Sequence, residues 1–190
     1  AFQAVSSAKN VYIEENNIDE YIEWTKSLKF VNLETADLDN ARFASAENTY
    51  LSNNTPSQKI DALKNYLNKY PDGIHKLKAN FYLGNLYFSN SNLETAINAF
   101  QNVVKNGQNE YSEQALVKLA QIYLKNQKNN LAIPILKRIE TEATEAVNVS
   151  FAKSNLMQSF YQTKQYKSAI AYAQKIINTR ASEKTLTNDA

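Results

Sequence analysis

One pattern of apolar residues recurs five times along the chain. Each copy has an aromatic anchor, and successive anchors stand 36 to 38 residues apart. The anchors are Tyr12, Tyr50, Tyr87, Tyr123 and Phe160. Sixteen residues after each anchor comes another apolar residue, and nine residues after the last three anchors comes an alanine. Self-similarity at this period is typical of solenoids built from helix pairs.

Each copy contains two helical stripes. In the third copy Leu83 and Tyr87 lie on the first stripe, and Ala96, Phe100 and Val103 lie on the second. Spacings of three, four and seven residues place apolar side chains on one face of an α-helix. A small residue opposite a large aromatic one allows two antiparallel helices to pack closely. We therefore predict an all-α fold, a right-handed α-solenoid of about five antiparallel helix pairs.

The repeats also predict the domain organisation. One superhelical domain is expected over residues 1–180, followed by a frayed tail at 181–190 that is polar at its end. Bulky Tyr21 makes the first repeat the most degenerate, as terminal repeats often are. The five repeats are expected at about 2–28, 40–70, 77–106, 113–141 and 150–178.

Local signals mark several helix ends. Thr55 followed by Pro56 predicts a helix start, with threonine at the N-cap and proline at the first helical position. Pro71 and Gly73 predict the end of that helix and a tight reversal. Asp39 is expected to cap the next helix in the chain.

Composition narrows the function classes. Hydrophobic residues make up 43% of the chain, enough for a packed core, while three glycines and three prolines favour helices over turn-rich folds. There is no cysteine and a single histidine, His75, so neither a thiol nucleophile nor a zinc site is expected. Neither a Gly-rich phosphate loop nor a triad spacing occurs. These observations predict a protein that is not an enzyme and uses no metal or cofactor.

Charge and hydropathy bear on partners. Residues 1–56 carry four Lys or Arg against nine Asp or Glu, whereas residues 57–190 carry seventeen against ten, giving a net charge of +2. The basic residues are dispersed along the chain, and the aromatic residues occupy core positions. We therefore do not expect nucleic acid as a partner. No stretch of 18 apolar residues occurs, so we expect no membrane insertion, and no signal-peptide pattern is present. Because the chain begins with Ala1, we expect a processed protein or an excised fragment.

The third copy resembles the tetratricopeptide repeat (TPR). That family's signature residues are matched by Leu83, Gly84, Tyr87, Ala96, Phe100 and Val103. The segments 63–73 and 79–88 are similar to the periplasmic branch of the family, which includes the tol-pal coordinator and outer-membrane-assembly lipoproteins. The resemblance implies a scaffold for protein–protein interaction in the periplasm or cell envelope of a bacterium, with the cytoplasm as an alternative. The period here exceeds the 34 residues usual in the family.

The resemblance also implies that the first helix of each pair lines a concave groove. Two residues before every anchor stands a carboxamide, which offers two donors and an acceptor to a peptide main chain. We predict that this groove binds a peptide segment or a partner helix. The candidate groove residues are the carboxamides Asn10, Asn48, Asn85, Gln121 and Gln158, together with Lys78, Phe81, Phe88, Lys125 and Tyr161.

Two other functions stay open. The first alternative is that the chain is a structural spacer within a longer array, stacked on further repeats and without its own ligand. Exposure of Ile170 and Ile177 on the last helix would favour that function. An α-helical hydrolase is the remote alternative, and it would require two facing carboxylates in an acidic pocket.

Overall fold

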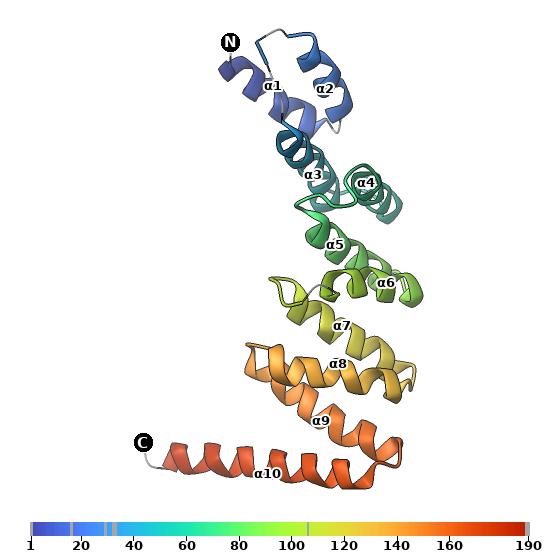
Figure 1. Cartoon of the computed structure of the whole chain (residues 1–190), viewed down its shortest axis with the longest axis vertical. Helices are drawn as coiled ribbons and strands as arrows, with labels where there is room; N and C mark the ends of the chain where they lie inside the picture. Colours follow the sequence, from blue (N-terminus) through green and yellow to red (C-terminus); the bar gives the residue numbers. More distant parts are fainter. Residues whose placement is uncertain (1, 16, 29, 32–33, 106, 189–190) are drawn as a thin grey trace. The chain divides into compact units, whose positions relative to one another are not determined.

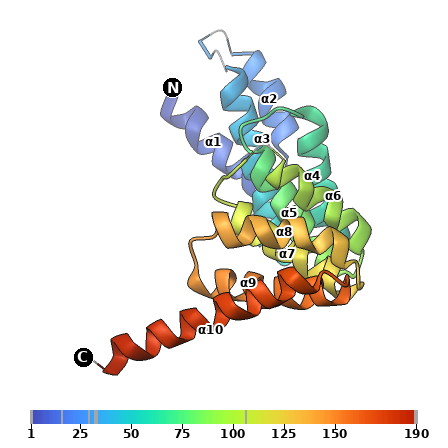
Figure 2. The ribbon, with the colours of Figure 1, turned by 60° about the horizontal axis from the view of Figure 1, so that its bottom comes forward.

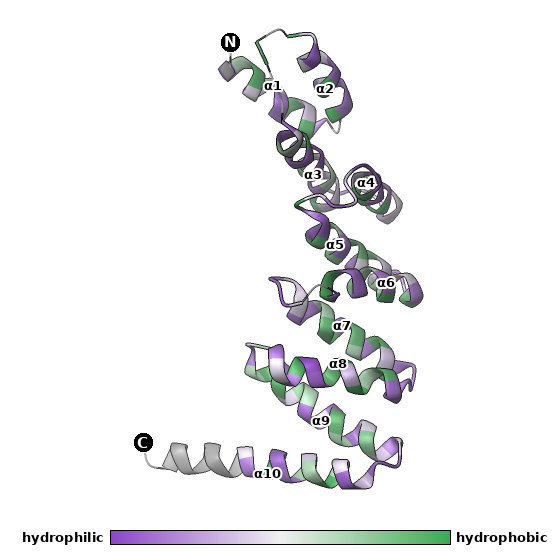
Figure 3. Ribbon diagram, in the orientation of Figure 1, coloured by the Kyte–Doolittle hydropathy of each residue, from purple (hydrophilic) through white to green (hydrophobic). Residues whose placement is uncertain are grey.

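The chain is helical throughout the part that the structure describes. This computed structural model covers residues 2–15, 17–28, 30–31, 34–105 and 107–188, and within them it has ten α-helices and no strand (Figure 1). The helices are α1 (Phe2–Glu14), α2 (Ile18–Lys26), α3 (Thr35–Leu51), α4 (Pro56–Lys69), α5 (Lys76–Ser89), α6 (Leu93–Val104), α7 (Ser112–Lys125), α8 (Asn129–Glu142), α9 (Ala146–Gln162) and α10 (Tyr166–Asn188). Hydrophobic and hydrophilic residues alternate in short groups along these helices, as one-sided burial requires (Figure 3).

The helices form two compact units where the sequence predicts one domain. Unit 1 comprises residues 1–99 and unit 2 comprises residues 100–190, so the division falls within α6. A helix pair of a solenoid contacts only its neighbours in sequence, so contacts are sparse between distant repeats. The two units are therefore described one at a time.

Unit 1 has two clusters of buried side chains. Helices α1, α2 and α3 pack together, and Tyr21 lies in the first cluster at only 2% exposure. The second cluster forms where α3 and α5 both pack on α4, around fully buried Leu63 and nearly buried Tyr66. Bulky Tyr21, which departs from the repeat pattern, is thus a core residue of the first repeat.

In unit 2 each helix packs on the next, from α7 through α8 and α9 to α10. The core of this unit combines aliphatic and aromatic side chains: Leu119, Leu136, Ile139 and Leu156 are all fully buried, and Phe160 of α9 is buried as well. Fully buried Ala132 lies on α8, and its small side chain permits the close approach of the neighbouring helices. Figure 2 shows the backbone of α10 projecting past the end of α9.

Three turns between paired helices share one backbone conformation. In each, the N–H five residues after the aromatic anchor donates to the anchor's carbonyl, as in a Schellman motif. These bonds run from Asn92 to Tyr87, from Lys128 to Tyr123 and from Gln165 to Phe160, at 2.9, 2.8 and 2.8 Å. The residue before each donor has a positive φ: Ser91 at 59°, Gln127 at 54° and Lys164 at 61°. The anchor therefore fixes the turn as well as the core.

The predicted helix ends are partly confirmed. Thr55 is the N-cap of α4 and accepts from the Gln58 N–H, with Pro56 in the first turn. The prediction for Asp39 is wrong, because α3 begins at Thr35 with a capping box, and Asp39 lies inside the helix. At the other end of the chain, α10 continues to Asn188 instead of ending at 180, since neither glycine nor proline interrupts it.

Candidate functional site

In unit 1 the predicted groove residues lie on three successive first helices, α1, α3 and α5. Asn10 is exposed on α1, while Asn85, Phe81 and Phe88 are half-buried on α5. Asn48 on α3 donates through Nδ2 to the carbonyl of Ile13, at 3.4 Å. That bond links the first helices of two adjacent repeats, so Asn48 supports the packing of unit 1.

Lys78 takes part in a charged and aromatic network between α3 and α5. Its ammonium lies 2.7 Å from Glu47 and sits over the rings of Phe43 and Tyr82. The Tyr82 hydroxyl also donates to Glu47, at 2.7 Å. Burial opposes ionisation of Glu47, but the hydrogen bonds from Lys78 and Tyr82 outweigh it and lower the pKa of that carboxyl. Lys78 therefore joins two repeats.

In unit 2 the predicted residues lie on α7 and α9. Gln121 and Lys125 are exposed on α7, and Gln158 is exposed on α9. Tyr161 is 62% exposed and packs edge-to-face on Tyr166, with ring centroids 5.7 Å apart. No internal hydrogen bond of the described part of the chain engages the Gln121 or Gln158 side chains.

Gln158 lines a pocket of about 390 Å³ in unit 2, which we call the carboxamide cleft. Its walls come from α7, from α9, from the turn between α7 and α8 and from the first residue of α8. Five carboxamides and one leucine line it: Leu124, Gln127, Asn129, Asn155, Gln158 and Gln162. An adjoining pocket of about 490 Å³ shares Gln127, Asn129 and Gln162 with it. The cleft carries no charged lining residue.

The side chains of the cleft are positioned by its own backbone and neighbours. The positive φ of Gln127 turns the chain between α7 and α8 and places this residue in the wall. Asn155 donates through Nδ2 to the Phe151 carbonyl at 2.8 Å, and its Oδ1 stays available as an acceptor. Ser159, fully buried, donates through Oγ to Oδ1 of Asn129 at 3.3 Å. The cleft thus presents donors and acceptors beside one apolar side chain.

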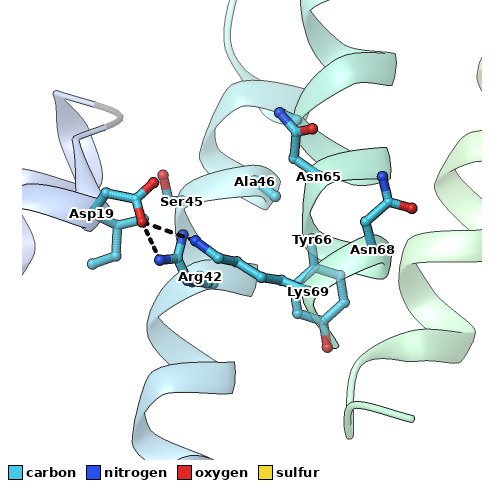
Figure 4. Close-up of a pocket in the computed structure, with 10 residues that line it drawn as sticks. Asp19, Arg42, Ser45, Ala46, Asn65, Tyr66, Asn68 and Lys69 are labelled. Atoms are coloured by element: carbon cyan, nitrogen blue, oxygen red, sulfur yellow. Dashed lines mark hydrogen bonds and ion pairs between the residues drawn. The ribbon is translucent and has the colours of Figure 1, made fainter. Parts of the chain in front are cut away.

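A second site lies in unit 1, among α2, α3 and α4 (Figure 4). Asp19 forms ion pairs there with Arg42 and with Lys69, whose Nζ lies 3.1 Å from Oδ1 of Asp19. The hydrogen bond from Arg42 and the one from Lys69 lower the pKa of Asp19 to about 2. This charged pocket has a volume of about 440 Å³, and its other lining residues are Ile18, Ser45, Ala46, Ala62, Asn65, Tyr66 and Asn68.

Sequence reasoning found part of the carboxamide cleft and missed the charged pocket. Gln158 was predicted, whereas Asn155 and Gln162 were not, although they lie three residues before and four after it on α9. That helical spacing was a usable signal. Asp19, Arg42 and Lys69 come from three separate helices, so no local pattern joins them.

Comparison with solved structures assigns the fold. The crystal structure of MamA matches with 15% identity and a TM-score of 0.55, over 93% of this chain and 96% of that chain. TPR-like repeats of a Podosopora anserina protein described as a kinesin light chain match at 14% identity and a TM-score of 0.53, over 95% of each chain. A point variant of the same repeats matches with a TM-score of 0.52 and 14% identity, over 96% of each chain.

The chain has a TPR-like fold. The predicted all-α class of paired, solenoid-forming helices is thereby confirmed, while the handedness of the superhelix stays a prediction. At 14–15% identity the TPR-like neighbours show the fold and not the ligand. No protein-family model matches the sequence, and comparison with curated proteins gives no match.

The described residues show neither a metal-binding cluster nor a membrane-spanning helix. Among the described residues there is no cluster of three or more His, Cys, Asp or Glu side chains able to hold a metal ion. In the same part of the chain, no helix combines the length and apolar character needed to cross a bilayer.

Proposed function

We propose that this protein is a non-catalytic protein-interaction module that holds an extended peptide segment in the carboxamide cleft. One observation carries the proposal: five carboxamides converge on an uncharged pocket between the first helices of two successive repeats. TPR-like folds present such surfaces in general, which supports the same function.

The chemistry of the cleft suits a peptide main chain. Each carboxamide supplies two N–H donors and a carbonyl acceptor, the same groups that an extended peptide exposes along its backbone. Leu124 offers one apolar contact for a side chain of the ligand. No charged residue lines the cleft itself, and Lys128 lines the adjoining pocket, so we expect only weak selection of a peptide by its charge. We therefore expect recognition to depend on the main chain, with weak preference for ligand sequence.

Selection of peptides from a random library on the purified chain, followed by titration, tests the proposal. The double variant Gln158→Ala with Gln162→Ala should weaken a selected peptide about tenfold, because a net hydrogen bond contributes roughly 0.5–1.5 kcal/mol. Gln114→Ala is the matched control, since Gln114 is exposed on α7 and lies outside the cleft. If both variants lose peptide affinity equally, or if neither variant loses affinity, the assignment of the cleft is overturned.

A structural function is the second candidate, and exposure on α10 favours it. Ile170 is 69% exposed and Ile177 is 59% exposed. They are seven residues apart, so they lie on one helix face. The equivalent position to Ile177 in the third repeat is Val104, which is buried at 5% exposure. Another helix pair stacked on α10 would cover this face.

Sedimentation of the wild-type chain and of the Ile170→Glu variant tests this structural function. Concentration-dependent association of the wild type that is lost in the variant would support stacking. A monomer in both cases would oppose it.

The cellular location is a further part of the proposal. The likeness of segments 63–73 and 79–88 to periplasmic repeat proteins supports a bacterial periplasm or cell envelope. Fractionation of source cells with an antibody to the chain tests this location, and recovery in the cytoplasmic fraction alone would contradict it.

The charged pocket contains one carboxylate, Asp19, where an α-helical hydrolase would need a facing pair.

A further inference from the structure

We propose that the charged pocket of unit 1 binds the carboxylate of a single acidic side chain on a protein partner. The site lies outside the carboxamide cleft and carries a different chemistry. The inference rests on the proposed function only in that the carboxylate belongs to a partner protein.

The first argument is the local charge. Two cations, Arg42 and Lys69, share one carboxylate, that of Asp19, so the pocket has an excess positive charge of one unit. Figure 4 shows both cationic side chains directed at the same Asp19 oxygen, one from α3 and one from α4. A second carboxylate would bring the charge of the pocket to zero.

Arg42 and Lys69 also have more hydrogen-bond donors than their present partners use. A guanidinium has five N–H donors and an ammonium has three. Asp19 Oδ1 accepts one from Nη2 of Arg42 and one from Nζ of Lys69, and Tyr70 also engages Arg42. Lys69 is 56% exposed, so its ammonium can reach a new carboxylate while it stays near Asp19. Donors therefore outnumber the acceptors already present.

The third argument is the shape of the pocket. Its volume of about 440 Å³ exceeds that of one side chain, and Ala46 and Ala62 provide apolar surface for methylene groups. Asn65 and Asn68 project from α4 beside the pocket and add carboxamide donors (Figure 4). A glutamate side chain has the matching parts, an apolar stem and a carboxylate end.

The surroundings limit the ligand to one acidic residue. Residues 1–56 contain nine Asp or Glu and four Lys or Arg, so the sequence around α2 and α3 is rich in acidic residues. A run of acidic residues would be repelled by that excess. An isolated glutamate or aspartate in a neutral segment meets less of this repulsion, because it carries a single negative charge.

Side-chain NMR of the whole chain tests the inference with two blocked glycine–serine pentapeptides, one with a central glutamate and one with glutamine. The glutamate peptide should shift the side-chain amide signals of Asn65 and Asn68 and the Nε signal of Arg42 in a saturable way. The glutamine peptide should leave them unchanged. Equal shifts with both peptides, or no shift with either, would overturn the inference.

Two variants complete the test. Lys69→Gln should weaken the glutamate peptide about fivefold, as expected for one exposed ion pair. Lys64→Gln, on the exposed side of α4 and outside the pocket, should leave the affinity unchanged. Equal affinities for wild type and Lys69→Gln would also overturn the inference. The amide signals of Gln158 and Gln162, followed with a selected cleft peptide, report on the proposed function independently, so either proposal can fail alone.

Discussion

Units 1 and 2 carry the same repeat but use polar side chains differently. In unit 1, polar groups from successive repeats bind one another: Asp19 forms ion pairs with Arg42 and Lys69, and Glu47 forms one with Lys78. In unit 2 the core residues of α7 and α9 are apolar, and the polar side chains of the carboxamide cleft face an uncharged pocket. A repeat therefore fixes which positions are buried, and leaves the remaining positions free either to join repeats or to bind a ligand.

Several bonds that join repeats have the same span in sequence, slightly less than one repeat period. Asn48 to Ile13, Tyr82 to Glu47 and Lys175 to Glu140 each span 35 residues, and so does Asn148 to Glu113. Such bonds connect nearby, but not equivalent, positions of successive repeats, because 35 residues is shorter than the spacing of 36 to 38 between anchors. They occur in both units, so the difference between the units lies in the pockets and not in the way that repeats are linked.

The largest expected effect concerns the buried polar network of unit 1. Asp39 is 5% exposed and accepts from the Tyr66 hydroxyl at 2.6 Å and from the Ile74 N–H at 2.8 Å. Asp39→Ala leaves both donors without this acceptor, so unfolding free energy should fall by roughly 2–5 kcal/mol in urea titration. Asp72→Ala, at a 94% exposed side chain, is the control and should change little. A loss below about 1 kcal/mol for Asp39→Ala would show that the network contributes only as much as a helix cap.

The core of unit 2 should respond to overpacking. Ala132 is fully buried on α8, so Ala132→Phe forces the neighbouring helices apart and should cost roughly 1–3 kcal/mol of stability. Exposed Ala171 on α10 provides the control, Ala171→Phe, with little expected change. Thermal unfolding followed by circular dichroism measures both. A melting temperature equal to that of wild type in Ala132→Phe would contradict the packing of α8 described here.

Acid sensitivity in unit 2 should depend on Glu113. Its carboxylate accepts hydrogen bonds from the Asn148 side chain and the Thr144 N–H, which lower the pKa from 4.5 to about 2. Because the folded-state pKa is depressed, this stabilisation is present above pH 4.5 and is lost as pH falls from 4.5 to 2. Glu113→Gln should therefore flatten the dependence of stability on pH in that window and lower stability at pH 7 by about 1 kcal/mol.

Urea titrations at several pH values between 2 and 7 measure this dependence. Glu110→Gln is the control, because Glu110 is exposed in the turn before α7. An unchanged pH profile in Glu113→Gln would show that Glu113 does not stabilise the start of α9.

The smallest expected effect is a stabilisation. Lys164 is exposed in the turn before α10 with φ of 61°, a conformation that favours glycine. Lys164→Gly should stabilise the chain by about 0.5–1 kcal/mol, whereas Lys164→Ala, which keeps the Cβ, should not. Urea titration of the two variants separates the backbone contribution from the lost charge, and equal stabilities would contradict the turn conformation.

The repeated apolar pattern was sufficient to predict the helices and the paired architecture. Burial of Leu83, Ala96 and Leu136 follows directly from helical spacing. The turns at Ser91, Gln127 and Lys164 were harder to predict from the sequence, because none of them has the glycine that usually marks a positive φ. Periodicity therefore gave the fold class, while the turn conformation required coordinates.

Contacts between repeats were the least predictable part. Asp39 was expected at a helix end, but its partners Tyr66 and Ile74 lie 27 and 35 residues away. Glu140, near the end of α8, accepts a hydrogen bond from the Tyr172 hydroxyl of the next repeat, a contact that no local pattern in the sequence indicates. Side-chain pairing across repeats depends on three-dimensional register, which local propensity does not determine.

The most direct test of the central claim is a main-chain methylation scan of a peptide selected for the carboxamide cleft. Each N-methyl group removes one backbone donor of the peptide and leaves its side chains unchanged. Titration of the wild-type chain should show a loss of about fivefold or more at the methylated positions that contact Gln158 and Gln162, since a hydrogen bond contributes roughly 0.5–1.5 kcal/mol. Alanine substitution at the same peptide positions should matter less. If N-methylation has no effect while side-chain substitution abolishes binding, the carboxamides do not recognise a main chain and the proposed function of the cleft is wrong.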